Sequence, residues 1–376
     1  MQQSMASQRR LSEIEGLRGI AALLVVLMHG SEIVGEFVFV TGFGFLSALH
    51  AVDFGRLGVA IFFLISGYLI PSSLHGSGAD GFKLFWIRRV FRLYPAYWVS
   101  VPLAYFAYWT ALDLNFNVMD LLANFTMMQE FAGIKSIQGL YWTLHVELVF
   151  YVFCSIAFLF GISRNPVSHA SFSLVGYLVF VIAMACTLGG LIEKGGWQHT
   201  VGMYGLHLGM MFWAALFRSI RTTPIANGLV RLYFMAVPLG FVLLLAAAGW
   251  SAASPGTINP DILRLAFAYP VAFIVFLAFA SGRFCVPEFL CSVGEVSYSL
   301  YLFHPVVLYG ICIPLGAAGV FSNYSSEYGG FFLTVFLLAP CLIVAKICYR
   351  FVEASAMSMG RSLTEGPLSK LSMMKS

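Results

Sequence analysis

Long apolar runs alternate with short polar or charged interruptions along most of this chain. Each run is close to the ~20 residues that a helix needs to cross the hydrocarbon core of a bilayer. Proline, glycine and charged residues mark where the runs begin and end. The pattern predicts about ten membrane-spanning helices, at residues 18–40, 57–74, 94–112, 140–160, 171–192, 200–217, 229–249, 262–281, 296–316 and 329–350.

Three stretches do not follow this pattern. Residues 85–92 are basic and aromatic, and we expect an interfacial helix there that leads through Pro95 into the third span. A more polar loop is predicted at 113–139, and a short polar tail after Glu353. The expected organisation is a cytoplasmic N-terminus at 1–17, a transmembrane domain at 18–353 and a cytoplasmic tail at 354–376.

Composition supports an all-α polytopic membrane bundle. The chain of 376 residues is 60% hydrophobic and only 10% charged, with a mean hydropathy of +0.85. Soluble domains carry about 25% charged residues. We therefore expect a multi-pass protein in a membrane, most simply a bacterial inner membrane, with membrane lipid as a partner and no nucleic acid.

The distribution of basic residues predicts the topology. With the N-terminus in the cytoplasm and ten spans, the outside segments hold only four of the 21 Lys and Arg residues, namely Arg56, Lys135, Lys194 and Arg264. Lys and Arg concentrate on the cytoplasmic side of membrane proteins. Both termini are therefore predicted to be cytoplasmic.

The first apolar run has an arginine at one end and a histidine at the other. Arg18 and His29 are eleven residues apart, which is close to three helical turns, so both side chains are expected on one face, about 16 Å apart. If Arg18 marks the membrane surface, His29 lies near the midplane. An ionisable side chain there is a functional candidate, although a histidine can also hydrogen-bond a neighbouring helix.

Six stretches, read in order, resemble one family. They are Glu15-Gly-Leu-Arg18 through His29, Phe62-Phe-Leu-Ile-Ser66-Gly67-Tyr68, Arg88-Arg89-Val-Phe-Arg92-Leu-Tyr-Pro95, Trp142-Thr-Leu-His-Val-Glu147-Leu-Val-Phe-Tyr151, Ser297-Tyr298-Ser-Leu-Tyr301-Leu-Phe-His304-Pro305 and Tyr349-Arg-Phe-Val-Glu353. Together they resemble the acyltransferase 3 family of integral membrane O-acyltransferases over nearly the whole chain.

The resemblance implies transfer of an acyl group, usually acetyl from cytoplasmic acetyl-CoA, to a hydroxyl group of a glycan or glycolipid. Acetyl-CoA would be a co-substrate, and no permanently bound cofactor is expected. The chain departs from the family at one point, because Ala60 stands where many members carry an acidic residue just before the Phe-Phe of the second span. A role tied to an acidic residue at that position is therefore in doubt.

The chemistry of acyl transfer suggests roles for the first motif. A base must take the hydroxyl proton, and histidine titrates nearest to neutral pH. His29 is therefore the candidate general base or transient acyl carrier. Arg18 is the candidate for the donor end, where its guanidinium would hold a CoA phosphate or polarise the thioester.

Arg89 and Arg92 are three residues apart and share a helical face. We interpret them as ligands of the donor phosphates, with binding of anionic lipid headgroups as the alternative. Tyr298, Tyr301 and His304 approximate another face and are candidates for lining the donor entrance, although tyrosines are also common at membrane interfaces.

Glu147 lies inside the fourth span, where an isolated carboxylate rarely faces lipid. It is a candidate to bind the acceptor sugar or to orient His29, and the alternative is a structural bond to a Tyr or Trp. Ser66 and Gly67 are expected to allow close helix approach, and Trp142 and Glu353 belong to the family's structural motifs. No metal site is predicted, because His29, His145, His207 and His304 form no i,i+4 pair and no Cys-His cluster.

Two other classes of function can be compared with the sequence. Ten spans with an intramembrane His and Glu are also compatible with a secondary transporter or exporter of a small glycoconjugate or organic acid, but no internal repeat supports it. A non-catalytic scaffold is disfavoured, because large loops and docking domains are absent from the sequence.

Overall fold

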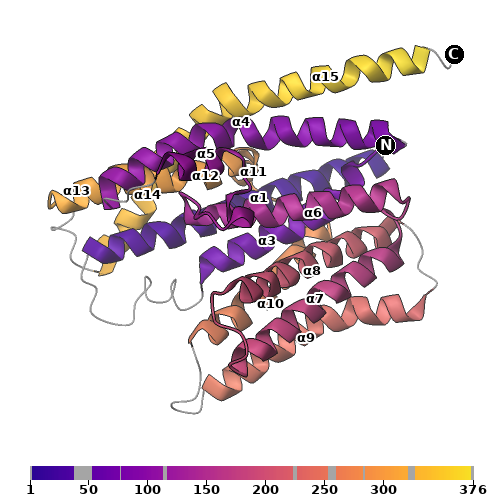
Figure 1. The fold of residues 1–376 in the computed structure, drawn as a ribbon, viewed down its shortest axis with the longest axis horizontal. Helices are drawn as coiled ribbons and strands as arrows, with labels where there is room; N and C mark the ends of the chain where they lie inside the picture. The colour runs from indigo at the N-terminus through magenta and orange to yellow at the C-terminus, as the bar shows by residue number, and fades with distance from the viewer. Residues whose placement is uncertain are drawn as a thin grey trace. The chain divides into compact units, whose positions relative to one another are not determined.

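The computed structural model describes residues 2–37, 53–76, 78–112, 117–222, 227–252, 260–282, 284–320 and 327–373. All regular structure in these ranges is helical (Figure 1). The helices of eleven or more residues are α1 (Gln2–Phe37), α3 (Phe54–Leu69), α4 (Gly78–Leu112), α6 (Trp142–Leu159), α7 (Pro166–Leu188), α8 (Trp197–Thr222), α9 (Gly228–Ala252), α10 (Pro260–Ala280), α12 (Ser297–Val307), α14 (Glu327–Cys348) and α15 (Ala354–Met373). Shorter helices are α5 (Val118–Phe125), α11 (Glu288–Glu295) and α13 (Ile313–Ala317).

Within the described ranges, seven helical segments are long and apolar enough to cross a membrane. They are Ser12–Gly35, Phe54–Ser73, Gly139–Leu159, Pro166–Leu188, Trp197–Thr222, Ser297–Ala317 and Gly330–Thr364. The predicted spans 229–249 and 262–281 contain the shorter apolar helices Gly228–Leu244 and Arg264–Ala280. An all-helical bundle with several spans is therefore confirmed, whereas the count of ten and the sides of the termini stay predictions.

Several boundaries differ from those predicted. The basic segment and the third span form one continuous helix, α4, through Pro95 and Pro102. The predicted loop at 113–139 contains α5, and the predicted polar tail is mostly the helix α15. Residues 38–40, the end of the first predicted span, lie outside the described residues.

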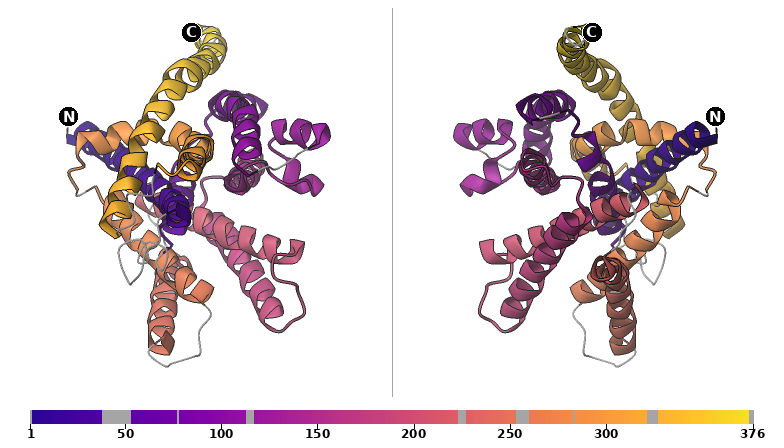
Figure 2. Two further views of the ribbon diagram at one scale, coloured as in Figure 1. Left: turned by 90° about the vertical axis from the view of Figure 1, so that its left-hand side faces the viewer. Right: turned by 90° about the vertical axis from the view of Figure 1, so that its right-hand side faces the viewer.

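The chain divides into two compact units. The first comprises residues 1–58, 83–142 and 278–376, and the second comprises residues 59–82 and 143–277. In the first unit α1 contacts α11, α12 and α14, and in the second α7 packs along α8 with α9 beside them (Figures 1 and 2). The candidate residues at both ends of the first apolar run therefore belong to one unit.

Glycine lets α1 and α11 approach closely. A Cβ built on Gly19 would overlap the carbonyl oxygen of Leu290, and one on Gly294 would overlap the carbonyl oxygen of Glu15. Only glycine leaves space for such backbone contact. This contact holds the polar N-terminal half of α1 against the short helix α11.

Candidate functional site

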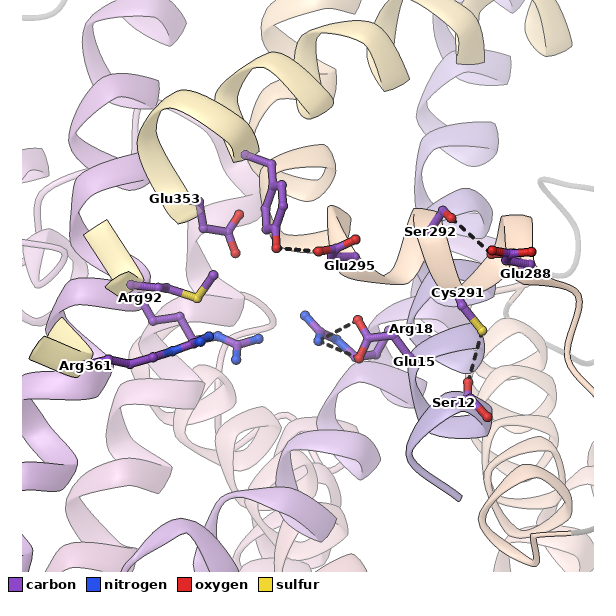
Figure 3. Close-up of a pocket in the computed structure, with 12 residues that line it drawn as sticks. Ser12, Glu15, Arg18, Arg92, Glu288, Cys291, Ser292, Glu295, Glu353 and Arg361 are labelled. Carbon is purple, nitrogen blue, oxygen red and sulfur yellow. Dashed lines mark hydrogen bonds and ion pairs between the residues drawn. The ribbon is translucent and has the colours of Figure 1, made fainter. Parts of the chain in front are cut away.

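A polar pocket of about 580 Å³ opens in the first unit (Figure 3). Its walls come from α1, α4, α11 and the helix that runs from α14 into α15. Its lining residues are Ser12, Glu15, Arg18, Arg92, Glu288, Cys291, Ser292, Glu295, Tyr349, Glu353, Met357 and Arg361. Seven of these twelve side chains carry a formal charge, which is unusual in a chain with only 10% charged residues.

Helical spacing explains how each element presents its residues. On α1, residues 12, 15 and 18 follow one another at three-residue intervals, and on α11, residues 288, 291, 292 and 295 share one face. Beyond α14, residues 353, 357 and 361 are four apart and again lie on one face. Three helical faces thus meet around a single space.

Three guanidinium groups point into the pocket from different helices. Figure 3 shows Arg18 of α1 facing Arg92 of α4 and Arg361 of α15. The Arg18 Nη1 atom donates to Glu15 Oε1 at 3.1 Å, and the Arg18 side chain is only 14% exposed. Each of the three guanidinium groups can donate charge-assisted hydrogen bonds to an anion. Four carboxylates, those of Glu15, Glu288, Glu295 and Glu353, line the same pocket.

Carboxylates hold the rest of the pocket in place. Glu353 is 2% exposed, and its Oε2 atom accepts a hydrogen bond of 2.7 Å from Ser299 Oγ of α12. The Tyr349 hydroxyl donates to Glu295 Oε1 at 2.7 Å, which ties the end of α14 to α11. Tyr349 and Glu353 bound a π-helical turn between α14 and α15.

Cys291 contributes a thiol to the same pocket. Its Sγ atom donates to the Ser12 carbonyl oxygen at 3.3 Å. Burial raises the pKa of this thiol, and the carboxylates of Glu15 and Glu288 raise it further. At neutral pH the thiol is therefore protonated and a weak nucleophile.

His29 lies three helical turns from Arg18 on α1 and has a different environment. Its Nδ1 atom is 2.8 Å from Glu32 Oε2, and the two side chains are 41% and 46% exposed. A carboxylate accepts, so this contact fixes the proton of a neutral His29 ring on Nδ1 and leaves the lone pair of Nε2 available.

His304 of α12 stacks on His29, with ring centroids 5.4 Å apart. The Nδ1 atom of His304 is 3.1 Å from the Leu300 carbonyl oxygen, so Nδ1 must carry a proton. In the neutral ring Nε2 is then an acceptor; it is fully buried and has no hydrogen-bond partner among the described residues. The structure therefore places His304 beside His29 instead of in the pocket.

The other predicted donor-binding residues divide between the pocket and its surroundings. Arg92 lines the pocket, whereas Arg89 stacks over the Phe85 ring at 5.2 Å and does not line it. The hydroxyl of Tyr298 donates to the Leu93 carbonyl oxygen at 2.8 Å, and that of Tyr301 to the Leu140 carbonyl oxygen at 3.3 Å. Neither tyrosine lines the pocket.

Glu147 is bonded within the second unit. Its Oε1 atom accepts from Tyr151 at 2.5 Å and from Ser66 Oγ at 3.3 Å. A Cβ built on Gly67 would overlap the Met211 carbonyl oxygen, so α3 and α8 approach closely there. Trp142 is the first residue of α6. The carboxylate in contact with His29 is that of Glu32.

Sequence reasoning missed several residues of the site. Glu32 follows His29 by three residues, a spacing that predicts contact on a helix. Glu288 and Glu295 are seven residues apart and share a face, although α11 is too short to be found as a span. Arg361 would have been found by continuing the helix beyond Glu353 at intervals of four. In the described parts of the chain, no group of three His, Cys, Asp or Glu residues is placed to hold a metal ion.

The amino-acid sequence also matches known proteins. The family model described as "Acyltransferase domain" matches residues 11–350. The acyltransferase MdmB of Streptomyces mycarofaciens is 22% identical, and the alignment covers 93% of this chain and 92% of that protein. Nodulation protein 10 of Rhizobium leguminosarum bv. viciae is 26% identical over 84% and 86% of the two chains.

A third relative is the putative O-acetyltransferase SACOL0978 of Staphylococcus aureus (strain COL). It is 25% identical over 92% of this chain, which spans 57% of that longer protein. No solved structure matches the chain. The apolar helices and the extent of the family match together identify a multi-pass integral membrane protein. The chain belongs to the acyltransferase family that the six sequence motifs predicted.

Proposed function

We propose that this protein transfers an acetyl group from acetyl-CoA to a hydroxyl group of a carbohydrate or glycolipid. The observation that carries the proposal is the arrangement of α1, which has an arginine-rich pocket at Arg18 and a carboxylate-paired histidine at His29. The two residues are about 16 Å apart along the helix. CoA likewise separates its phosphates from its thioester by an extended pantetheine arm.

The pocket would hold the phosphate end of the donor. Arg18, Arg92 and Arg361 supply guanidinium groups that fit phosphate oxygens in pairs. Glu15 and Glu353 keep two of the walls fixed through their bonds to Arg18 and Ser299. Because these bonds hold the side chains before the donor arrives, little conformational freedom is lost when its phosphates bind.

His29 would then act on the acceptor. With a proton on Nδ1 held by Glu32, its Nε2 atom takes the hydroxyl proton as the oxygen attacks the thioester carbonyl. The C–S bond breaks, and the CoA thiolate leaves and takes up a proton. In the other route that the geometry allows, Nε2 first accepts the acetyl group and then passes it to the hydroxyl.

Relatives support the choice of donor and acceptor classes. Several are putative O-acetyltransferases by name, which favours acetyl as the transferred group and an oxygen as its acceptor. With the N-terminus in the cytoplasm, as the basic residues predict, the pocket lies on the side where acetyl-CoA is made. A bacterial inner membrane is the location we propose.

The test uses native membranes and acetyl-CoA labelled in the acetyl group. Membranes from cells that express the protein should transfer label to a glycan or glycolipid as an alkali-labile ester, and membranes that lack it should not. The His29→Ala variant should reach the membrane and transfer none. Modified product formed without acetyl-CoA, or full transfer by the His29 variant, would contradict the proposal and favour a transporter.

A further inference from the structure

The segment that joins α4 to α6 returns toward α4 and α12. The Tyr97 hydroxyl donates to the Asn124 carbonyl oxygen at 2.6 Å, and Trp98 Nε1 donates to the Phe125 carbonyl oxygen at 3.0 Å. Near its end, the Tyr301 hydroxyl donates to the Leu140 carbonyl oxygen at 3.3 Å. We call residues 117–141 the return segment; it lies in the first unit, as do His29 and His304.

Most polar side chains inside the return segment have partners. The Asn124 amide donates to the carbonyl oxygens of Asp120 and Lys135 and accepts from the Ile137 amide. Gln129 Nε2 bonds Ser136 Oγ at 2.8 Å. Together with the helix α5 and two short 3-10 turns, these bonds give the segment a defined shape.

Gln138 differs even from Gln129, of which only the amide oxygen is buried without a partner among the described residues. Its side chain is fully buried, and neither the amide nitrogen nor the amide oxygen has a hydrogen-bond partner among the described residues. A buried amide left without partners is costly, and such groups usually bind water or a ligand. The Gln138 amide is therefore a candidate to bind a polar group.

Tyr301 connects the part of the chain that holds Gln138 with His304. Gln138 is two residues from Leu140, which the Tyr301 hydroxyl contacts, and the Tyr301 ring centroid is 6.1 Å from that of His304. The buried Nε2 atom of His304 is likewise without a partner in the part of the chain described. An amide and an imidazole acceptor without partners among the described residues are thus linked through the neighbourhood of Tyr301, and the imidazole stacks on His29.

We propose that this neighbourhood is the acceptor site, and that its occupant is a hydroxyl-rich molecule such as a sugar. An amide both donates and accepts, which suits adjacent hydroxyl groups, and His304 Nε2 accepts from a hydroxyl. The Tyr97 and Tyr141 rings, 4.8 Å apart and both fully buried, add aromatic surface from α4 and the return segment. Because His304 stacks on His29, a hydroxyl bound there lies beside the proposed base.

This inference rests on the proposed function and names its acceptor site. Gln138 is a positioning residue: it orders the sugar, whereas His29 acts on the reacting oxygen. Replacing the amide with an apolar side chain of similar size should weaken acceptor binding and leave donor binding intact. Removing two unsatisfied polar atoms should also leave the empty protein as stable as before, or more stable.

The experiment compares Gln138→Leu with Gln198→Leu, the same change at an exposed residue of α8. Membranes carrying each variant receive labelled acetyl-CoA and increasing amounts of a glycolipid and polysaccharide extract from cells lacking the gene. For Gln138→Leu we expect the apparent KM for the extract to rise about tenfold, with an unchanged KM for acetyl-CoA. Gln198→Leu should match the wild type.

An unchanged KM for the extract would overturn the inference and leave Gln138 bonded to buried water only. A lower thermal stability with equal losses toward donor and extract would also overturn it, because that is the effect of a structural residue. If Gln138→Leu fails to assemble, Gln138→Met provides the same test with a flexible side chain. Absence of transfer by the wild type would instead contradict the proposed function itself.

Discussion

Arg18 and His29, at the two ends of the apolar run in α1, differ in how many charged side chains surround them. Around Arg18, four chain segments bring seven charged side chains to one pocket. Around His29 the structure shows one carboxylate, Glu32, and one stacked imidazole, His304. Binding a multiply charged anion needs several fixed charges, whereas moving one proton needs a single base with a defined tautomer.

The largest effect is expected at the histidine end. His29→Ala should lower the rate of acetyl transfer by about 10²–10⁴-fold, the range for loss of a general base. Acetyl-CoA should still bind, because the pocket is unchanged. Initial rates with labelled acetyl-CoA measure the loss, and His75→Ala, at an exposed histidine, serves as the control. Equal activity of the two variants would remove His29 from the mechanism.

At the pocket end, Arg92→Ala should raise the KM for acetyl-CoA by about 10–100-fold, because a charge-assisted hydrogen bond is lost. Arg89→Ala is the matched comparison, since Arg89 lies over Phe85 outside the pocket and should change that KM little. Titrations of both variants with acetyl-CoA measure the two KM values. Equal effects would show that the donor does not use this pocket.

Glu32→Gln tests how much the carboxylate of Glu32 contributes to the action of His29. The variant keeps the side-chain size but loses the charge that strengthens the hydrogen bond from His29 Nδ1. Because the pair is half-exposed, we expect about a fivefold fall in kcat. The KM for acetyl-CoA should stay the same, which a donor titration measures. A change in the KM for acetyl-CoA would mean that Glu32 also affects binding of the donor.

The smallest effect concerns Cys291 in the pocket. Because its pKa is raised, little thiolate is present at neutral pH, and alkylation by N-ethylmaleimide should be slow and should accelerate as the pH rises. CoA should slow the reaction further by covering the thiol. Mass spectrometry of the Cys291 peptide gives the rate, with the exposed Cys285 as an internal control. Equal protection of both cysteines would argue against CoA binding here.

Much of the fold followed from the sequence, because apolar runs of membrane length specify helices directly. The long helices lie close to the predicted ranges, and Arg18, Arg92 and Glu353 do meet at one pocket. The helix α11 was missed, since eight residues give too short a periodic signal. The return segment was predicted only as part of a polar loop, because its shape depends on side-chain to backbone bonds such as those of Asn124.

The partners of the candidate residues were harder to predict than their identities. Tyr298, Tyr301 and His304 share a helical face, but their bonds go to Leu93, Leu140 and Leu300, and only the packed structure shows this. Arg89 and Arg92 likewise share a face on α4, yet one lines the pocket and the other does not. Periodicity gives the direction of a side chain within its own helix and says nothing about the neighbour that it meets.

The π-helical turn at Tyr349–Glu353 sets where this part of the gene tolerates a change in length. A π turn accommodates one residue more than an α turn, so losing one codon there would convert it to α-helix and leave the helix beyond close to its original face. Losing one codon between Glu353 and Arg361, where the helix is regular, would instead rotate Arg361 by about 100° away from the pocket, while the apolar α14 kept its surroundings. A one-residue deletion in α15 would thus disable the proposed donor site of a protein that still inserts and folds, a lesion that hydropathy would not reveal.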